Sequence, residues 1–245
     1  MTSFARWVHR RLLGHYGRPA WAMGYTPLEE LVGTILSQHT SDLNSDRAFA
    51  SLKQRFATWE SVRDAPVAEL TDTIRSGGLA VVKADRIQAV LRALTDADGV
   101  VRLPNLRHLP RERAVRILTE LPGVGRKTAA CVLLFGAHVP ALPVDTHVHR
   151  VALRLGLVSA KASPEATADA LEAELDPRQY YAFHVNVIRL GREICKAPRP
   201  RCEICPLQDR CASAGASARR TTRGSRRYTA SSNSASRATL ASNIA

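Results

Sequence analysis

Apolar residues recur along most of the chain at the three- and four-residue spacing of an α-helix. Near the N-terminus, one helical face would carry Phe4, Trp7, Val8, Leu12 and Leu13. The same spacing predicts further helices at residues 27–36, 42–56, 66–76, 87–94, 110–121 and 179–190. Few segments are rich in Val, Ile, Thr and aromatic residues together, and no internal repeat is visible. The pattern therefore predicts an all-α fold.

Several of these helices have clear start signals. Thr26 is a suitable N-cap, and Pro27 suits the first helical position. A Ser-Pro-Glu sequence beginning at Ser163 gives the same signal for a later helix. Residues 38–41 form a polar break, after which Asp42 can begin the next helix.

The chain is strongly basic, with 35 Lys and Arg residues against 22 Asp and Glu and a formal net charge of +13. This excess favours a polyanionic partner, with nucleic acid ahead of an anionic membrane surface. No apolar run reaches the roughly 18 residues needed to span a bilayer. Because a secretory segment is also missing, we expect no membrane partner and a reducing cytoplasmic location, associated with the nucleoid if the protein is bacterial.

Residues 212–245 differ in composition from the rest of the chain. They are rich in Ser, Ala and Arg, include six arginines and contain no Asp or Glu. Such a segment cannot bury enough apolar surface to fold alone, so we expect a disordered basic tail that holds DNA loosely. The remaining body then carries a charge of +13 − 6 = +7.

The segment LPGVGRKTAACVL, residues 121–133, predicts a tight turn between two helices. Pro122 disfavours continuation of the preceding helix, and Gly123 and Gly125 permit a left-handed turn with little side-chain bulk. Backbone amides from Gly123 through Val124 to Gly125 can then approach an anion, beside the positive end of a helix that begins near Arg126. The segment is a candidate phosphate clamp, although an ordinary helix–helix connection would also use these residues.

Lys127 stands out because the chain has only five lysines among its 35 basic residues. A helix N-terminus and the neighbouring Arg126 both disfavour a charged amine at this position, and partial burial would add to the effect. Schiff-base chemistry requires a neutral amine, which arginine cannot supply. Lys127 is therefore a candidate nucleophile.

A second cluster, PVDTHVHRV, follows at residues 143–151. Asp145 can cap the next helix, and if it faces Lys127 across a cleft it can also stabilise charge or transfer a proton. A nearby carboxylate would favour the charged form of Lys127 and so oppose the helix effect. The sequence leaves open which influence is stronger.

Four cysteines form a C-x6-C-x2-C-x5-C run, a strong signal for a metal centre. Their spacing suits either structural zinc or an iron–sulfur cluster. The six-residue loop between the first two contains Lys196, Arg199 and Arg201, which could contact backbone phosphates. Cys131 lies outside the run, and we expect it in the core. The four candidate ligands are Cys195, Cys202, Cys205 and Cys211.

Taken together, LPGVGRKTA, VDTHV and the cysteine run resemble the endonuclease III family of helix-hairpin-helix DNA glycosylases, over about residues 22–211. The resemblance implies a two-lobed monomer with a DNA cleft and a [4Fe-4S] cluster on the four cysteines. It implies an N-terminal helix (1–21) packed on the cluster lobe, a six-helix domain (22–137) with the hairpin, and a cluster domain (138–211). The basic tail (212–245) would follow.

The resemblance also implies a bifunctional glycosylase and AP lyase that acts on oxidised pyrimidines in double-stranded DNA. A damaged base would be flipped into the cleft, Lys127 would attack C1′ of its sugar, and β-elimination would nick the strand. Asp145 would assist the nucleophile or stabilise the cationic sugar. The amides of Gly123 and Gly125 would hold a phosphate, and His147 would line the pocket.

Two segments depart from the family pattern, which leaves the preferred base open. Where many members have LSAQATD, this chain has LSQHTSD, so either Gln38 or His39 could fill the space left by the flipped base. In GLAVVKA (residues 78–84), Ala80 and Val81 replace a Tyr-Asn pair. Adenine glycosylases have a catalytic Glu where this chain has Gly33. A monofunctional glycosylase for another lesion, or a binding protein with little activity, stays as the alternative.

Overall fold

The computed structural model describes residues 3–21 and 24–214. Within these residues it contains α-helices, short 3-10 segments and a π-helical turn (Val132–Gly136), with no strand beyond an isolated bridge between Thr95 and Val101. The predicted all-α fold is confirmed. The α-helices are α1 (Phe4–Tyr16), α2 (Pro27–Ser37), α3 (Asp42–Arg55), α4 (Trp59–Asp64), α5 (Val67–Thr73), α6 (Ala80–Ala93), α7 (Arg111–Thr119), α8 (Arg126–Cys131), α9 (Thr146–Leu155), α10 (Pro164–Glu174) and α11 (Tyr180–Glu193).

The start signals in the sequence correspond to real caps. Thr26 and Glu29 form a capping box at the start of α2, in which the Glu29 amide donates to Thr26 Oγ1 at 3.3 Å and the Thr26 amide donates to Glu29 Oε2 at 2.9 Å. The Ser163 hydroxyl likewise accepts the Ala166 amide at the start of α10. These local hydrogen bonds satisfy amides that have no partner inside a helix.

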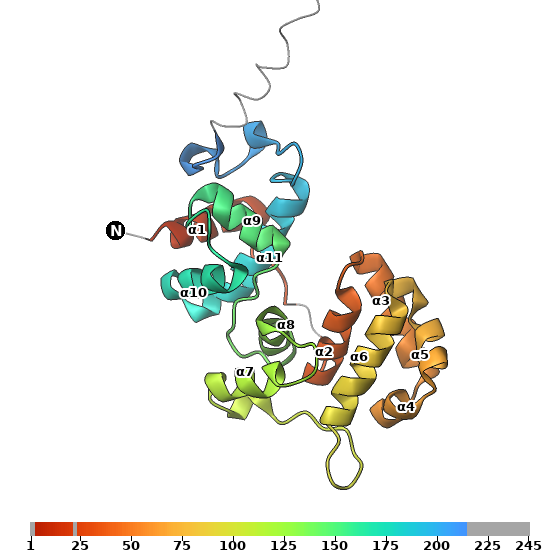
Figure 1. Cartoon of the computed structure of the whole chain (residues 1–245). Coiled ribbons are helices and arrows are strands. Elements are labelled where there is room, and N and C mark those ends of the chain that lie inside the picture. Colours follow the sequence, from red (N-terminus) through yellow and green to blue (C-terminus); the bar gives the residue numbers. More distant parts are fainter. Residues whose placement is uncertain (1–2, 22–23, 215–245) are drawn as a thin grey trace, which may run out of the picture.

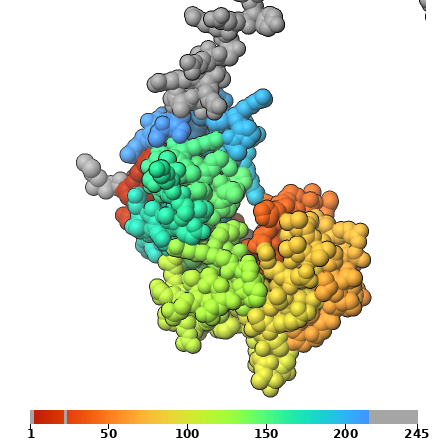
Figure 2. All heavy atoms as spheres, viewed as in Figure 1, coloured from red at the N-terminus to blue at the C-terminus, as the bar shows by residue number. Residues whose placement is uncertain are grey.

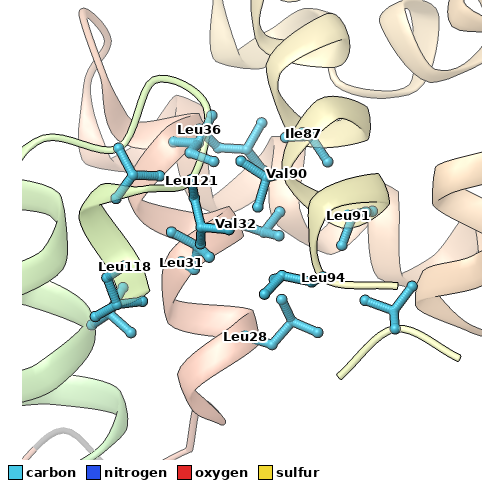
Figure 3. Close-up of a cluster of buried hydrophobic side chains, with 14 of the residues drawn as sticks. Leu28, Leu31, Val32, Leu36, Ile87, Val90, Leu91, Leu94, Leu118 and Leu121 are labelled. Carbon is cyan, nitrogen blue, oxygen red and sulfur yellow. The ribbon is translucent and has the colours of Figure 1, made fainter. Parts of the chain in front are cut away.

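The first of two hydrophobic cores surrounds α2. Leu31, Val32 and Leu36 of this helix are completely buried, and α6 and α7 cover them with apolar side chains (Figure 3). The π-helical turn also packs closely on α2. A Cβ atom at Gly136 would lie only 2.8 Å from Pro27 Cα, so this approach requires glycine. The helices α2 to α8 thus form one lobe, with α2 at its centre (Figure 1).

The second core joins the two ends of the described chain. Val8 and Leu12 of α1 are completely buried against apolar residues of α9, α10 and α11 (Figure 1). The protein is therefore two-lobed, and the chain passes between the lobes on both sides of α2–α8. The clusters interleave near residues 134–142, and we propose the domain limits 1–21, 22–137 and 138–211 on this basis. The predicted disordered tail lies outside the described residues from residue 215 onward.

A buried lysine fixes the C-terminal end of α2. Lys83 of α6 is 3% exposed, and its Nζ donates to the carbonyl oxygens of Leu36 at 2.6 Å and Gly77 at 2.7 Å. Burial lowers the pKa of Lys83, and the two carbonyls compensate for lost hydration. The end of α2 is thereby held to α6 and to the short segment that precedes α6.

No helix in the described part of the chain is long and apolar enough to cross a membrane.

Candidate functional site

The predicted turn between α7 and α8 forms a compact hairpin. Gly123 adopts a left-handed φ of 71°, which favours glycine. The Val124 amide donates to Leu121 O at 3.1 Å, and the Val124 side chain is buried, so the turn is anchored from within. Gly125 is the N-cap of α8. The backbone of this turn is consequently held in one conformation at the start of the helix that carries Lys127.

Lys127 lies in the first turn of α8 and is exposed, whereas the residues that follow it up to Cys131 are buried. Partial burial therefore does not add to the helix effect at Lys127. Because α8 starts at the surface and runs inward, only its later residues enter the core. The amine is accessible to a ligand without rearrangement of the fold.

Asp145 is the N-cap of α9, and its Oδ1 accepts the Val148 amide at 2.7 Å. The segment before it is fixed by His184 of α11, whose Nδ1 donates to Pro143 O at 2.9 Å, since a carbonyl can only accept. His184 was not identified from the sequence because it lies among apolar residues of a helix, where a single histidine is usually a core residue. It holds the chain two residues before Asp145.

Lys127 and Asp145 both act electrostatically on two buried groups. Burial lowers the pKa of His184 to about 4; Asp145 raises this pKa and Lys127 lowers it. Burial raises the pKa of the Cys131 thiol to about 11, with Lys127 lowering it and Glu30 and Asp145 raising it. Both charges therefore act on the same side chains at the junction of the lobes. The space-filling view is hollowed between the part built by α2–α6 and the part built by α9–α11 (Figure 2).

Comparison with known proteins identifies the family. Residues 32–177 match the family described as HhH-GPD superfamily base excision DNA repair protein, which is more than half of the chain. The chain belongs to this superfamily.

Relatives of this HhH-GPD protein include endonuclease III of Thermotoga maritima, which is 38% identical over 185 residues that cover 76% of this chain and 82% of the relative. A solved non-covalent endonuclease III–DNA complex covers 87% of this chain and 96% of its own, with a TM-score of 0.77 and 30% identity. A trapped endonuclease III–DNA covalent intermediate covers 86% and 95%, with a TM-score of 0.76 and 30% identity. The HhH-GPD protein is a base excision repair DNA glycosylase close to endonuclease III.

The segment Ser37–Ser41, which we call the gap segment, presents its two candidate residues differently. His39 is exposed and adopts a left-handed φ of 53°. Gln38 is half-buried, and its Oε1 accepts a hydrogen bond from Arg86 NH1 at 2.7 Å. The Arg86 side chain also packs over Gly123 of the hairpin. Any side chain at position 123 would displace Arg86. Arg86 was not identified from the sequence, because nothing distinguishes it from the other arginines on helices.

Glu30 is a further ionisable group that sequence reasoning missed. It lies on α2, which packs against α8, one helical turn before Gly33. Burial raises its pKa to about 7; a hydrogen bond from Thr34 Oγ1 at 3.1 Å and the charge of Lys127 act in the opposite direction. At Gly33 itself a Cβ would meet open space. The carboxyl group that α2 places near Lys127 therefore comes from Glu30.

The raised pKa of Glu30 predicts a pH-dependent effect of the variant Glu30→Gln. A raised folded-state pKa means that folding favours the protonated acid, so wild-type stability falls as pH rises from about 4.5 to about 7. Glutamine lacks this titration and should raise the melting temperature by several degrees at pH 8, for a gain of about 1–3 kcal/mol, with little change near pH 5. Lys127, Cys131 and Tyr25 are the other titratable groups that interact with Glu30.

Glu29→Gln is the matched control. Although burial raises the pKa of Glu29, hydrogen bonds from Thr26 and Lys53 lower it overall. The ionised Glu29 carboxylate therefore stabilises the fold above its unfolded-state pKa, and this stabilisation is lost in acid. Glu29→Gln should consequently lower the melting temperature at pH 8. An equal shift at both pH values in Glu30→Gln would contradict the raised pKa.

Two predicted site residues are engaged in contacts within the fold. Arg126 NH1 donates to Asp169 of α10 at 3.2 Å, so a carboxylate offsets the positive charge expected beside Lys127. His147 Nδ1 accepts a hydrogen bond from Arg150 NH2 at 3.1 Å within α9, and the same NH2 donates to Gly191 O of α11 at 2.9 Å. A cavity of about 300 Å³ between α7, α8 and α10 is lined by Arg126 and Lys127, whereas its described lining includes neither Asp145 nor His184.

The four cysteines of the predicted metal centre line one cavity of about 580 Å³. Burial raises the pKa of the Cys205 thiol, with further contributions from Cys195, Cys211 and Cys202, so all four sulfurs lie near one another. Among the described residues, however, no three potential ligands converge closely enough for a single metal ion. Zinc requires sulfurs at about 2.3 Å from one point, whereas a cubane cluster separates its ligands more widely. Four thiolates suit either a structural zinc ion or a [4Fe-4S] cluster.

The loop between the first two cysteines is held from α9. Arg154 donates to Lys196 O at 2.7 Å and to Ala197 O at 2.8 Å, and its NH1 also donates to Cys195 Sγ at 3.3 Å. The side chains of Lys196, Arg199 and Arg201 are exposed. This fixed backbone leaves three positive charges accessible to a polyanion.

Proposed function

We propose that this HhH-GPD protein is a bifunctional DNA glycosylase and AP lyase that acts on oxidised pyrimidines through a Schiff base on Lys127. The observation that carries the proposal is that an exposed lysine and the Asp145 carboxylate both act electrostatically on His184 and Cys131, which are buried. A relative with 30% identity has been trapped as a covalent DNA intermediate, which supports covalent chemistry here. Borohydride trapping on abasic-site DNA tests the proposal directly.

The proposed reaction starts from a nucleotide flipped out of the duplex. The neutral amine of Lys127 attacks C1′, and the bond from C1′ to the base breaks, with its electron pair and a proton leaving on the base. Loss of the amine proton and opening of the sugar ring give a Schiff base between Nζ and C1′. Removal of a C2′ proton then expels the 3′ phosphate by β-elimination. The Asp145 carboxylate stabilises the positive charge on the sugar and accepts a proton.

The hairpin and the basic loop would bind the DNA backbone around this site. Amides from Gly123 through Val124 to Gly125 can donate to one phosphate, which positions the strand without reading its sequence. Lys196, Arg199 and Arg201 would contact phosphates further along. His39 would enter the space left by the flipped base, because it is exposed whereas the neighbouring Gln38 is half-buried. We propose that the protein acts on double-stranded DNA as a cytoplasmic monomer.

We also propose that Cys195, Cys202, Cys205 and Cys211 hold a [4Fe-4S] cluster. The cluster would cross-link a segment with little secondary structure of its own and so keep the basic loop in place. No step of the proposed reaction passes through it.

The purified protein is therefore expected to be brown, with broad visible absorption and about four irons per chain. Cys202→Ser should lose this absorption, whereas Cys131→Ala should retain it because Cys131 lies in the core away from the cavity. A colourless protein with one zinc per chain would contradict the cluster.

A monofunctional glycosylase for another lesion is the second candidate. It is favoured by the altered segment at the start of α6, where Val81 and Val82 are 58% and 52% exposed. Apolar side chains there would recognise a base differently from a Tyr-Asn pair. Excision assays over a panel of damaged bases, with and without alkaline strand cleavage, separate the two candidates, because only a lyase nicks the strand unaided.

A further inference from the structure

Arg86 of α6 lies between the gap segment and the hairpin, the two elements to which the proposed function assigns a role in DNA binding. Its NH1 donates to Gln38 Oε1 in the gap segment at 2.7 Å. On the hairpin side, a Cβ built on Gly123 would lie 2.5 Å from Arg86 Nε and 2.9 Å from Cδ. The guanidinium therefore rests directly on the hairpin backbone while it binds the gap segment.

The charge of Arg86 differs from that of other arginines near the site. Arg111, Arg126 and Arg192 each pair with a carboxylate of another helix. Among the described residues, no carboxylate lies within ion-pair distance of Arg86. No acidic side chain therefore competes with Gln38 for the N–H donors of Arg86. The guanidinium binds the neutral side-chain amide of Gln38.

Helix α6 fixes the chain at the end of α2 and, two residues later, in the gap segment. Lys83 binds the Leu36 carbonyl, and Arg86, three residues later on the same face of the helix, binds Gln38. His39 follows directly in a left-handed conformation and is exposed. With Gln38 drawn inward, His39 is presented to the solvent.

We propose that Arg86 is a positioning residue that locks Gln38 against the hairpin and so makes His39 the side chain that enters the DNA duplex. This inference rests on the proposed function. It also links the two DNA-binding elements, because a shift of the hairpin at Gly123 would move the guanidinium that holds the gap segment.

A double-mutant cycle of Arg86→Ala and Gln38→Ala tests the coupling. The probe is a duplex with a tetrahydrofuran abasic analogue opposite 2-aminopurine, whose fluorescence reports whether a side chain enters the stack. Each single variant should weaken binding to this duplex about five- to tenfold, and the double variant should be no weaker than the worse single variant. The fluorescence change should fall in both, and His39→Ala should abolish it.

Arg92→Ala is the matched control, because Arg92 also lies on α6 and its NH2 also donates to a glutamine, Gln88, at 3.0 Å, away from the hairpin. It should leave the fluorescence change intact. Melting temperatures of the variants distinguish loss of positioning from loss of folding. Because lysine also donates a hydrogen bond, Arg86→Lys should retain part of the fluorescence change that Arg86→Ala loses. Additive effects in the cycle, or a full fluorescence change in Arg86→Ala, would overturn the inference. If the wild type does not bind the abasic duplex, the proposed function fails instead.

Discussion

Lys127→Ala is expected to abolish the covalent adduct that borohydride traps between the protein and abasic-site DNA. The substitution removes the only lysine of α8, whose charge acts on the same buried side chains as Asp145. We expect strand cleavage to fall by at least about a thousandfold, because a nucleophile cannot be replaced by binding contacts. DNA binding should persist, with a loss of affinity no larger than that caused by removing one exposed positive charge elsewhere.

Lys196→Ala is a suitable control for this result. This variant removes an exposed positive charge from the basic loop, so it should lower DNA affinity and make that affinity less dependent on salt concentration. At saturating enzyme the covalent adduct should still form. An adduct with Lys127→Ala would assign the nucleophile elsewhere. The absence of any adduct with wild type, on abasic and oxidised-pyrimidine duplexes alike, would refute the lyase proposal and favour the monofunctional candidate.

Asp145→Asn should have the second largest effect, a loss of about a hundredfold or more in the single-turnover rate with nearly unchanged DNA affinity. Asparagine also caps helices, so the hydrogen bond to the Val148 amide and the start of α9 should survive. The variant therefore removes the negative charge and keeps the geometry. Single-turnover cleavage and equilibrium binding on the same duplex separate the two quantities.

Asp145→Ala extends this test, because it also removes the cap. A further loss of thermal stability, of about 1 kcal/mol, should appear in the alanine variant and not in the asparagine variant. If Asp145→Asn cleaves as fast as wild type, the carboxylate acts only as a cap and has no part in the chemistry.

Features encoded in short segments were predictable from the sequence. The capping signals at Thr26 and Ser163 act within one helical turn, and both helices begin where expected. The glycine turn before Lys127 depends equally on neighbouring residues. By contrast, α4 has only six residues, too few to show a hydrophobic period.

The residues missed at the site depend on long-range packing. Glu30 approaches Lys127 only because α2 packs on α8, and His184 reaches Pro143 from 41 residues away. Arg86 meets Gln38 over a separation of 48 residues. The pattern of residues along one helix carries no information about such long-range contacts. The exposure of Lys127 likewise depends on how the whole lobe packs, because that packing places the start of α8 at the surface.

The placement of α1 has a consequence for the order in which the protein can fold during synthesis. Ala5 and Arg6 bind Glu174 of α10, about 170 residues later, at 3.0 Å and 2.7 Å. The lobe of α2–α8 is contiguous and can form as soon as it leaves the ribosome, whereas α1 emerges first and has no partner until α9–α11 are made. The N-terminal helix therefore spends most of translation with Val8 and Leu12 exposed, and the second lobe closes last.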